Sequence, residues 1–331
     1  MNKGKLFCLL SMALATNVLF ATGTQETNGT QSTGKTYKVG IAKIIAHPAL
    51  DSAEQGIQDY LATTDLSITY NRQNANGEIS TATDIAQQFK DVGTDVSVGL
   101  GTPTAQALAN AMKTKPLVFS AVTDPKSAGL EGKYICGVSD ANPVSAQIEL
   151  LQKVTKAQTI GCIYNSSEAN GVVLKDLAKA ACEKNGIEFV SASVINSAEV
   201  KMAAQSIIQR VDAIYLANDN AVVSAAASIS SVCKANNKAL LIADPGAAEG
   251  LDYLIAWGFN YYNIGYKTGE LVEQCLKGAT PGDIGSIILQ DPRDFEMVLN
   301  LDTAKDLGIT FSPDVLSMAA ATVENGIKTE K

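Results

Sequence analysis

From Tyr37 onward, short apolar runs alternate with segments that carry apolar residues at helical spacing, and this alternation constrains the fold most. The first series has strand-like runs at 37–42, 96–100, 116–122 and 134–138, separated by helical patterns. Continuous apolar runs are typical of parallel strands that are covered on both faces. Strands that alternate with helices predict a doubly wound α/β domain of the Rossmann type.

The same alternation restarts after Pro143, with strand-like runs at 159–164, 212–217 and 239–244. A chain of 331 residues is longer than one core usually organises, so we expect two such lobes. The C-terminal segments are expected to return to the first lobe and then to the second. The chain would therefore cross between the lobes several times, and these crossings would form the hinge. Hinges of that kind support closure of two domains around a ligand. We place the N-terminal lobe at 37–139 plus 246–282 and the C-terminal lobe at 140–245 plus 283–322.

The first residues have the features of a signal peptide. Lys3 and Lys5 precede an apolar stretch at 6–20, and Ala21-Thr22-Gly23 has the small–x–small pattern of a cleavage site. We therefore expect a signal peptide over 1–23, cleaved near Gly23, and a flexible polar tether over 24–36. No cysteine lies between positions 17 and 37, so no lipoprotein anchor is expected. The prediction is an exported protein, periplasmic or associated with the cell surface; an uncleaved membrane anchor is the alternative.

The composition argues against several classes of function. The formal net charge is −8 and no run of Lys and Arg stands out, so nucleic acid is not an expected partner. His47 is the only histidine, so neither a metal site nor a Ser-His-Asp triad is supported. The chain also lacks a G-x-S-x-G elbow and a phosphate-binding P-loop. We expect no catalysis, no metal and no cofactor.

Four loops of small polar residues follow apolar runs, each at the predicted start of a helix. They are Gly101-Thr102-Pro103-Thr104, Thr123-Asp124-Pro125, Asn165-Ser166-Ser167-Glu168 and Asn218-Asp219-Asn220. In an open α/β sheet, ligands bind beyond the carboxyl ends of the strands, and the free N–H groups of a helix start favour an anion. The loops therefore predict one site for a small molecule. The candidate ligand-binding residues are His47, Thr102, Pro103, Thr104, Thr123, Asp124, Asp140, Ser166, Ser167, Asp219, Asn220 and Asn260.

Several of these residues have a structural alternative that the sequence leaves open. Asp219 can accept an ammonium group at the end of a strand, or it can cap the helix that follows. Asp124 and Asp140 can likewise cap a helix or face the ligand, and His47 can form a wall of the pocket. Five aromatic residues between 253 and 262 can pack in the core, or one of them can stack on a ligand.

In this order and spacing, the loops resemble those of one known family. The pieces that carry the resemblance are His47-Pro48-Ala49-Leu50-Asp51, Gly101-Thr102-Pro103-Thr104-Ala105, Thr123-Asp124-Pro125, Gly137-Val138-Ser139-Asp140, Ser166-Ser167-Glu168-Ala169-Asn170 and Asp219-Asn220. The chain resembles the substrate-binding proteins of ABC importers of the tryptophan/tyrosine type, in the type I periplasmic binding protein superfamily. The resemblance implies two α/β lobes, three crossovers, a ligand in the cleft between the lobes, and a membrane permease with its ATPase as partners.

On this resemblance we expect a monomeric solute-binding protein that captures an aromatic amino acid, Trp, Tyr or Phe, by hinge closure. The ligand's carboxylate is expected at 102–104 and Thr123, and its ammonium group at Asp219 with Asn220. Relatives commonly carry Asp where this chain has Asn260. The neutral amide of Asn260 removes a possible partner for the ligand's ammonium group. A nucleoside, a sugar or a branched apolar amino acid is the alternative ligand, and an exported α/β enzyme or a sensor ectodomain is the alternative function.

Overall fold

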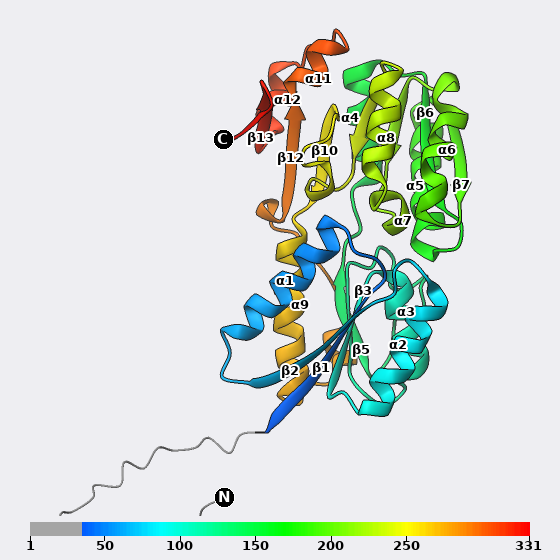
Figure 1. The fold of residues 1–331 in the computed structure, drawn as a ribbon. Helices are drawn as coiled ribbons and strands as arrows, with labels where there is room; N and C mark the ends of the chain where they lie inside the picture. The colour runs from blue at the N-terminus through cyan, green and yellow to red at the C-terminus, as the bar shows by residue number, and fades with distance from the viewer. Residues whose placement is uncertain (1–34) are drawn as a thin grey trace, which may run out of the picture. The chain divides into compact units, whose positions relative to one another are not determined.

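The computed structural model describes residues 35–331. The signal peptide predicted over 1–23, and the predicted tether up to residue 34, lie outside the described residues. Between residues 35 and 331, no helix has both the length and the apolar character that crossing a membrane requires. The described chain forms two α/β lobes, each built around a sheet of its own (Figure 1).

The N-terminal lobe has a six-stranded sheet in the order β11-β5-β4-β3-β1-β2, in which every strand pair is parallel. Its strands are β1 (Thr36–Lys43), β2 (Ser67–Asn74), β3 (Val96–Leu100), β4 (Leu117–Ser120), β5 (Ile135–Ser139) and β11 (Ser286–Ile288). The helices on one face are α2 (Ile79–Val92) and α3 (Thr102–Ala111), and those on the other are α1 (Pro48–Ala62) and α9 (Tyr261–Leu276) (Figure 1). The short α10 (Pro281–Ile284) precedes β11. Every residue of β3 and β4 is buried, as their mostly apolar sequences predict, and the buried residues include Ser97 and Ser120.

The C-terminal lobe has an eight-stranded sheet in the order β14-β13-β12-β10-β9-β8-β6-β7. Its pairs are parallel except β10 with β12 and β13 with β14. Its strands are β6 (Thr159–Asn165), β7 (Glu188–Val194), β8 (Ala213–Leu216), β9 (Ala239–Ile242), β10 (Ile255–Phe259), β12 (Phe295–Asn300), β13 (Ala321–Glu324) and β14 (Ile327–Glu330). Two doubly wound α/β lobes confirm the predicted fold class.

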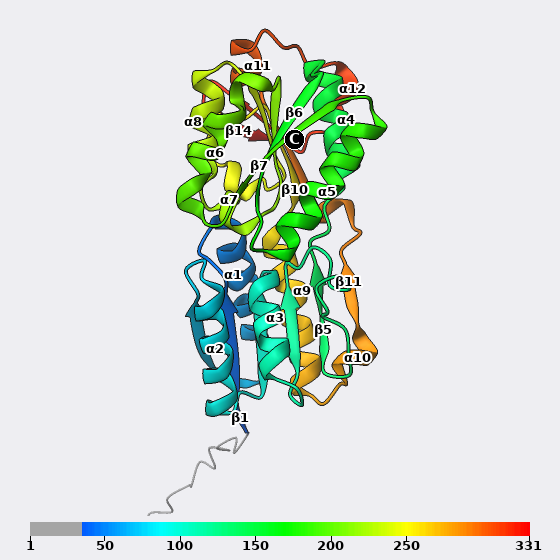
Figure 2. The same cartoon turned by 90° about the vertical axis from the view of Figure 1, so that its right-hand side faces the viewer.

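Helices cover both faces of this second sheet, and each face has its own apolar cluster. Figure 2 shows α4 (Val144–Thr155) and α5 (Ala169–Lys184) on one side, with α6 (Val200–Ile207) and α8 (Ala226–Ala235) on the other. The shorter helices are α7 (Asn220–Val223), α11 (Leu301–Asp306) and α12 (Pro313–Met318), with 3-10 turns η1 (Ser197–Glu199), η2 (Ile208–Arg210), η3 (Gly246–Ala248) and η4 (Pro292–Asp294).

The chain passes between the two sheets three times, as the three-crossover fold requires. The first crossover lies between β5 and α4, the second at Asn260 between β10 and α9, and the third between β11 and β12.

Two boundaries of the lobes differ from those expected from the sequence. We expected 246–282 in the N-terminal lobe, but β10 hydrogen-bonds to β9 and β12, so 246–259 belongs to the C-terminal lobe. We expected 283–322 in the C-terminal lobe, but β11 pairs with β5, and the second sheet extends beyond 322 to β14. An apolar run is buried equally well in either sheet, so its sequence does not decide which neighbour it pairs with.

Helices α1 and α9 approach each other closely because glycine lies at their contact. A Cβ atom built on Gly265 would overlap the carbonyl oxygen of Ala53, and one built on Gly56 would overlap that of Tyr262. The close approach holds the start of α1, after His47, beside the start of α9, at the second crossover. The two helices thereby position part of the site.

Candidate functional site

The loops at the carboxyl ends of the two sheets meet, and buried polar atoms concentrate where they do. Seven buried side-chain atoms have no hydrogen-bond partner among residues 35–331. They are His47 Nδ1 and Nε2, Thr102 Oγ1, Asn142 Oδ1, Asn170 Oδ1, Asn218 Oδ1 and Asp244 Oδ2. These six residues, which we call the interlobe polar cluster, follow β1, β3, β5, β6, β8 and β9. Each buried polar atom without a partner costs about 1–3 kcal/mol, so six such residues at one seam indicate a polar binding site.

Contacts between the loops join the two lobes at this seam. Asn142, on the first crossover, donates from Nδ2 to the carbonyl oxygen of Ala243 at 3.1 Å. The Asn220 amide lies against Gly101, whose φ of +87° turns the chain from β3 into α3. The His47 ring lies beside the same amide without a well-formed hydrogen bond. Burial lowers the pKa of His47 to about 4, so this imidazole is neutral at pH 7 and offers one donor and one acceptor.

Asp140 is a buried hub at the first crossover. Its Oδ2 accepts from Tyr261 Oη at 2.7 Å and from Asn218 Nδ2 at 2.8 Å, and its Oδ1 accepts from Thr123 Oγ1 at 3.1 Å. Burial raises the pKa of Asp140, and the three hydrogen bonds oppose that rise. The hub links the loop after β4, two crossovers and the loop after β8, so it ties the hinge to both lobes.

Both carboxylate oxygens of Asp219 accept hydrogen bonds from main-chain N–H groups. Its Oδ2 accepts from Asn165 N at 2.6 Å, and its Oδ1 accepts from Val222 N at 3.2 Å as the cap of α7. Burial and the neighbouring charge of Glu168 raise the pKa of Asp219 to about 7. The structural alternative considered for Asp219, a helix cap, is therefore present, and its contact with a ligand stays a prediction.

Asn220 is held by the same network. Its Nδ2 donates to Glu168 Oε2 at 2.6 Å, while Asn165 Nδ2 donates to Glu168 Oε1 at 2.9 Å. Glu168 is buried, and burial raises its pKa. This second buried carboxylate thus fixes the loops that follow β6 and β8 against each other.

Asp244 is a site residue that the sequence analysis missed. It is 1 % exposed, its Oδ1 accepts from Ala247 N at 3.2 Å, and its Oδ2 has no partner among the described residues. Burial raises the pKa of Asp244 to about 7, to which the charge of Asp140 adds. The signal was present in the sequence, because Asp244-Pro245 follows the apolar run of β9 just as Asp124-Pro125 follows that of β4.

The first turn of α3 combines one free and one engaged hydroxyl group. Thr102 Oγ1 is unpartnered, whereas Thr104 Oγ1 donates back to Leu100 O at 2.7 Å. Thr102, Pro103 and Thr104 are all buried. The first N–H groups of this ten-residue helix and the Thr102 hydroxyl lie at the seam, where they can hold an anion.

The remaining predicted residues do not belong to the interlobe polar cluster. Asp124 accepts from the main chain and hydroxyl of Ser127, and these two hydrogen bonds lower its pKa. Ser166 and Ser167 are exposed, and Ser166 donates to Val194 O at 3.2 Å. Asn260 caps α9 by accepting from Tyr262 N at 3.0 Å. Their contact with a ligand stays a prediction.

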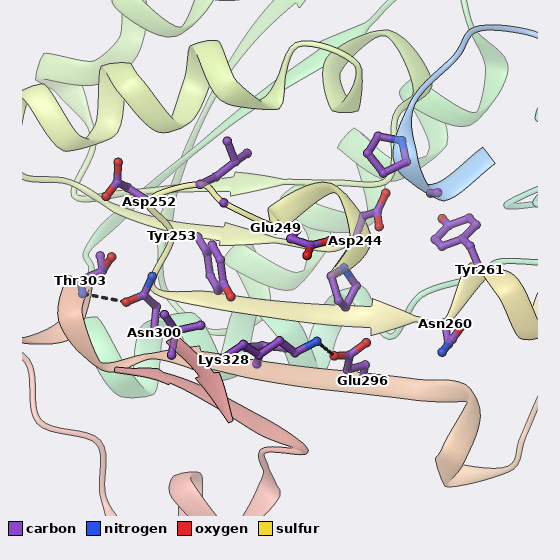
Figure 3. Close-up of a pocket in the computed structure, with 18 of the residues that line it drawn as sticks. Asp244, Glu249, Asp252, Tyr253, Asn260, Tyr261, Glu296, Asn300, Thr303 and Lys328 are labelled. Atoms are coloured by element: carbon purple, nitrogen blue, oxygen red, sulfur yellow. Dashed lines mark hydrogen bonds and ion pairs between the residues drawn. The ribbon is translucent and has the colours of Figure 1, made fainter. Parts of the chain in front are cut away.

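A groove of ≈ 790 Å³ begins at the seam and continues along the C-terminal lobe (Figure 3). Pro48, Asp244 and Tyr261 line the groove where it meets the seam, and residues of α11 and β14, among them Asp306 and Lys328, also line it. Asp244 thus belongs both to the interlobe polar cluster and to the wall of the groove.

Comparisons with known proteins agree with this architecture. Residues 38–323 match the model of the family described as ABC transporter substrate binding protein. The chain is 32% identical over 326 residues to a tyrosine-binding protein of Clostridioides difficile (strain R20291), covering 93% of each chain.

Two solved structures of similar sequence identity differ in how well they superpose. The first, an ABC domain in complex with L-Trp from Streptococcus pneumoniae, has 31% identity and a TM-score of 0.82, covering 87% of this chain and 100% of that one. The second, the ligand-free, open structure of an adhesive substrate-binding protein from Clostridium difficile, has 32% identity and a TM-score of 0.62, covering 84% and 97%. This chain therefore superposes better on the L-Trp complex than on the ligand-free, open structure. With the family model spanning nearly all of the described residues, this chain belongs to the ABC transporter substrate-binding proteins.

Proposed function

We propose that this solute-binding protein captures an aromatic amino acid, tryptophan or tyrosine, at the interlobe polar cluster. The observation that carries the proposal is the set of buried, unpartnered polar atoms contributed by loops of both lobes. A ligand that satisfies these atoms makes contacts that only the closed arrangement offers, so its binding favours closure. The relatives that bind tyrosine and L-Trp support the choice of ligand class.

In this proposal the ligand's carboxylate lies at the start of α3, against the Thr102 hydroxyl and the free N–H groups of the first turn. Its ammonium group lies against Asp244, whose Oδ2 is free, and Asp219 is the less suitable partner because both of its oxygens accept main-chain N–H groups. The amide oxygens of Asn142, Asn170 and Asn218 are acceptors for an indole N–H or a phenol O–H. Tyr261, which is 6 % exposed, is an aromatic wall near Asp244.

We also propose export, a monomeric state, and delivery of the ligand to a membrane permease driven by an ATPase. The ligand leaves chemically unchanged. Neutral, buried His47 and carboxylates engaged by main-chain donors support binding rather than turnover. Mass spectrometry of L-Trp or L-Tyr after long incubation with the protein tests this point, and a product that accumulates with time would contradict it.

Calorimetry tests the ligand class directly. L-Trp and L-Tyr are expected to bind with a dissociation constant around micromolar, or roughly −8 kcal/mol. A nucleoside, a pentose and L-leucine serve as the comparison solutes. Saturable binding of one of these without binding of L-Trp or L-Tyr would overturn the proposal, as would scattering curves that do not change with the ligand.

A further inference from the structure

The groove along the C-terminal lobe is strongly acidic. The side chains that line it include six carboxylates and a single lysine, Lys328. The six are Asp244, Glu249, Asp252, Glu296, Asp302 and Asp306. A volume of ≈ 790 Å³ is in the range of small-molecule sites. Walls of one charge sign in a concave site attract ligands of the opposite sign.

Part of this charge is balanced within the chain and part is not. Glu296 pairs with Lys328 at 2.5 Å, Asp252 pairs with Lys234 at 2.8 Å, and Asp302 accepts from the main chain of Gly326 at 2.8 Å. The carboxylates of Glu249 and Asp306 make no ion pair or hydrogen bond with another of residues 35–331, although the charge of Asp306 acts on nearby Lys234. One of these carboxylates therefore lies near Asp244 (Figure 3), and the other lies at the end of α11.

Two buried polar side chains also face the groove. Asp244 is 1 % exposed, and its Oδ2 has no partner in the described chain. Tyr253 is 5 % exposed and lies among the lining side chains, and its hydroxyl makes no hydrogen bond within residues 35–331 (Figure 3). Burial and the charges of Glu296 and Glu249 raise the pKa of Tyr253 to about 12, which reflects the negative potential at its hydroxyl. Because Asp244 Oδ2 is the proposed partner of the amino acid's ammonium group, the Tyr253 hydroxyl is the polar group that the groove offers in addition to its acidic rim.

Apolar surface separates the charged positions. Leu251, Val298 and Val323 line the groove together with the Tyr253 ring. The carboxylates do not converge, since no three acidic, His or Cys residues among 35–331 are grouped to hold a metal ion. Charges that are spread along a partly apolar groove match a linear chain with ammonium groups at intervals, and they do not match a single ion.

We propose that this groove binds a linear polyamine, with one ammonium group at Glu249 and another near Asp252 and Asp306. The methylene segments lie on Val298 and Val323, and an ammonium group over the Tyr253 ring gains a cation–π contact. This site is additional to the amino-acid site, and it does not depend on the proposed function.

Calorimetry with spermidine at about 20 mM salt, where exposed charges are weakly screened, tests the proposal. We expect saturable binding of one spermidine per chain. The double variant Glu249→Gln with Asp306→Asn removes the two unpaired carboxylates and is expected to weaken that binding roughly tenfold or more, because two charge-assisted contacts are lost. Tyr253→Phe keeps the ring and is expected to weaken binding by a smaller factor of about 3–10.

The matched control is Glu78→Gln with Asp84→Asn. These two exposed carboxylates lie at the start of α2, away from the groove, and the double change alters the net charge equally. Spermidine binding unchanged in this control and lost in the groove variant supports the site. Absence of saturable binding, or equal weakening in both double variants, would overturn it and leave only general attraction to an acidic protein.

A separate titration with L-Trp and L-Tyr on the same samples keeps the two proposals distinguishable. The groove variants Glu249→Gln with Asp306→Asn are expected to bind the amino acid as the wild type does. Failure of L-Trp and L-Tyr with spermidine binding retained contradicts only the proposed function, and the reverse result contradicts only the polyamine site.

Discussion

Tyr261 donates its hydroxyl hydrogen to Asp140 Oδ2 at 2.7 Å, although the two residues are 121 positions apart and lie on different crossovers. Both side chains are buried, at 6 % and 3 % exposure. The bond therefore joins the first crossing of the chain to the second inside the hinge. Any motion that separates the two crossovers has to break it.

Removal of this hydroxyl is expected to weaken the hinge. Tyr261→Phe leaves a buried carboxylate with two donors in place of three, so we expect a loss of about 1–3 kcal/mol in the free energy of unfolding. Urea denaturation measures it. Tyr262→Phe is the matched control, because the Tyr262 hydroxyl donates at 3.1 Å to Asp59 at the protein surface. Equal losses of unfolding free energy in the two variants would show that the buried hinge bond stabilises the protein no more than the surface bond does.

Substitutions can show which of the two candidates, Asp244 or Asp219, holds the ligand's ammonium group. Asp244→Asn is expected to weaken L-Trp binding by roughly 1.5–3 kcal/mol with little loss of stability, because only the free Oδ2 faces a ligand. Asp219→Ala is expected to lower the free energy of unfolding by about 1–3 kcal/mol, since it removes a helix cap and the acceptor of Asn165 N. Calorimetry and urea denaturation of both variants measure these effects.

Indole-3-propionate, which lacks the amine, serves as the control ligand for Asp244→Asn and is not expected to lose affinity. If Asp219→Asn reduced L-Trp binding while Asp244→Asn did not, Asp219 would hold the ammonium group as first expected from the sequence.

Stability is expected to fall as the pH rises toward neutrality. The folded-state pKa of Asp244 is about 7, well above the ordinary value of 3.8 for an aspartate in an unfolded chain. Between these values the folded protein binds a proton that the unfolded chain has released, so the stabilisation is complete below about pH 4 and is lost as the pH rises through about 7. One such carboxyl gives a slope of up to about 1.4 kcal/mol per pH unit.

Urea denaturation from pH 5 to pH 8 measures this slope. Asp244→Asn, which does not titrate, isolates the contribution of Asp244 from the general charge of the protein. An identical slope in the variant would contradict the raised pKa.

The contact between α1 and α9 predicts different losses of stability for two Gly→Ala substitutions in α9. Alanine in a helix interior is ordinarily more favourable than glycine by about 1 kcal/mol. Gly265→Ala is nevertheless expected to destabilise by at least about 2 kcal/mol, because the new methyl group overlaps the main chain of Ala53 and forces the helices apart. Gly269→Ala is expected to cost less, since its methyl group meets the Tyr60 Cβ at 2.8 Å and the Ile57 carbonyl oxygen at 3.1 Å, whereas a methyl group on Gly265 comes far closer to the Ala53 carbonyl oxygen. Thermal unfolding of the two variants checks the order, and a more stable Gly265→Ala protein would contradict it.

The alternation of apolar runs with helical patterns determined the architecture of this chain. Strands such as β8 and β9 are buried along their whole length, so their sequences are continuous apolar runs that can be recognised without a structure. The loops after β3, β4, β6 and β8 could also be recognised from the sequence, because small polar residues at a helix start are a local signal. The family resemblance added the three crossovers, which the sheet topology confirms, and the expectation that a ligand lies between the lobes.

Tertiary structure decided what depends on partners distant in the sequence. β10 and β11 are short apolar runs that either sheet could bury, and only their hydrogen bonds to β9, β12 and β5 assign them to a lobe. Asp219 and Asp244 both follow a buried strand. Whether an oxygen remains free for a ligand depends on which N–H groups the folded chain brings to it, and those of Asn165 and Val222 reach only Asp219.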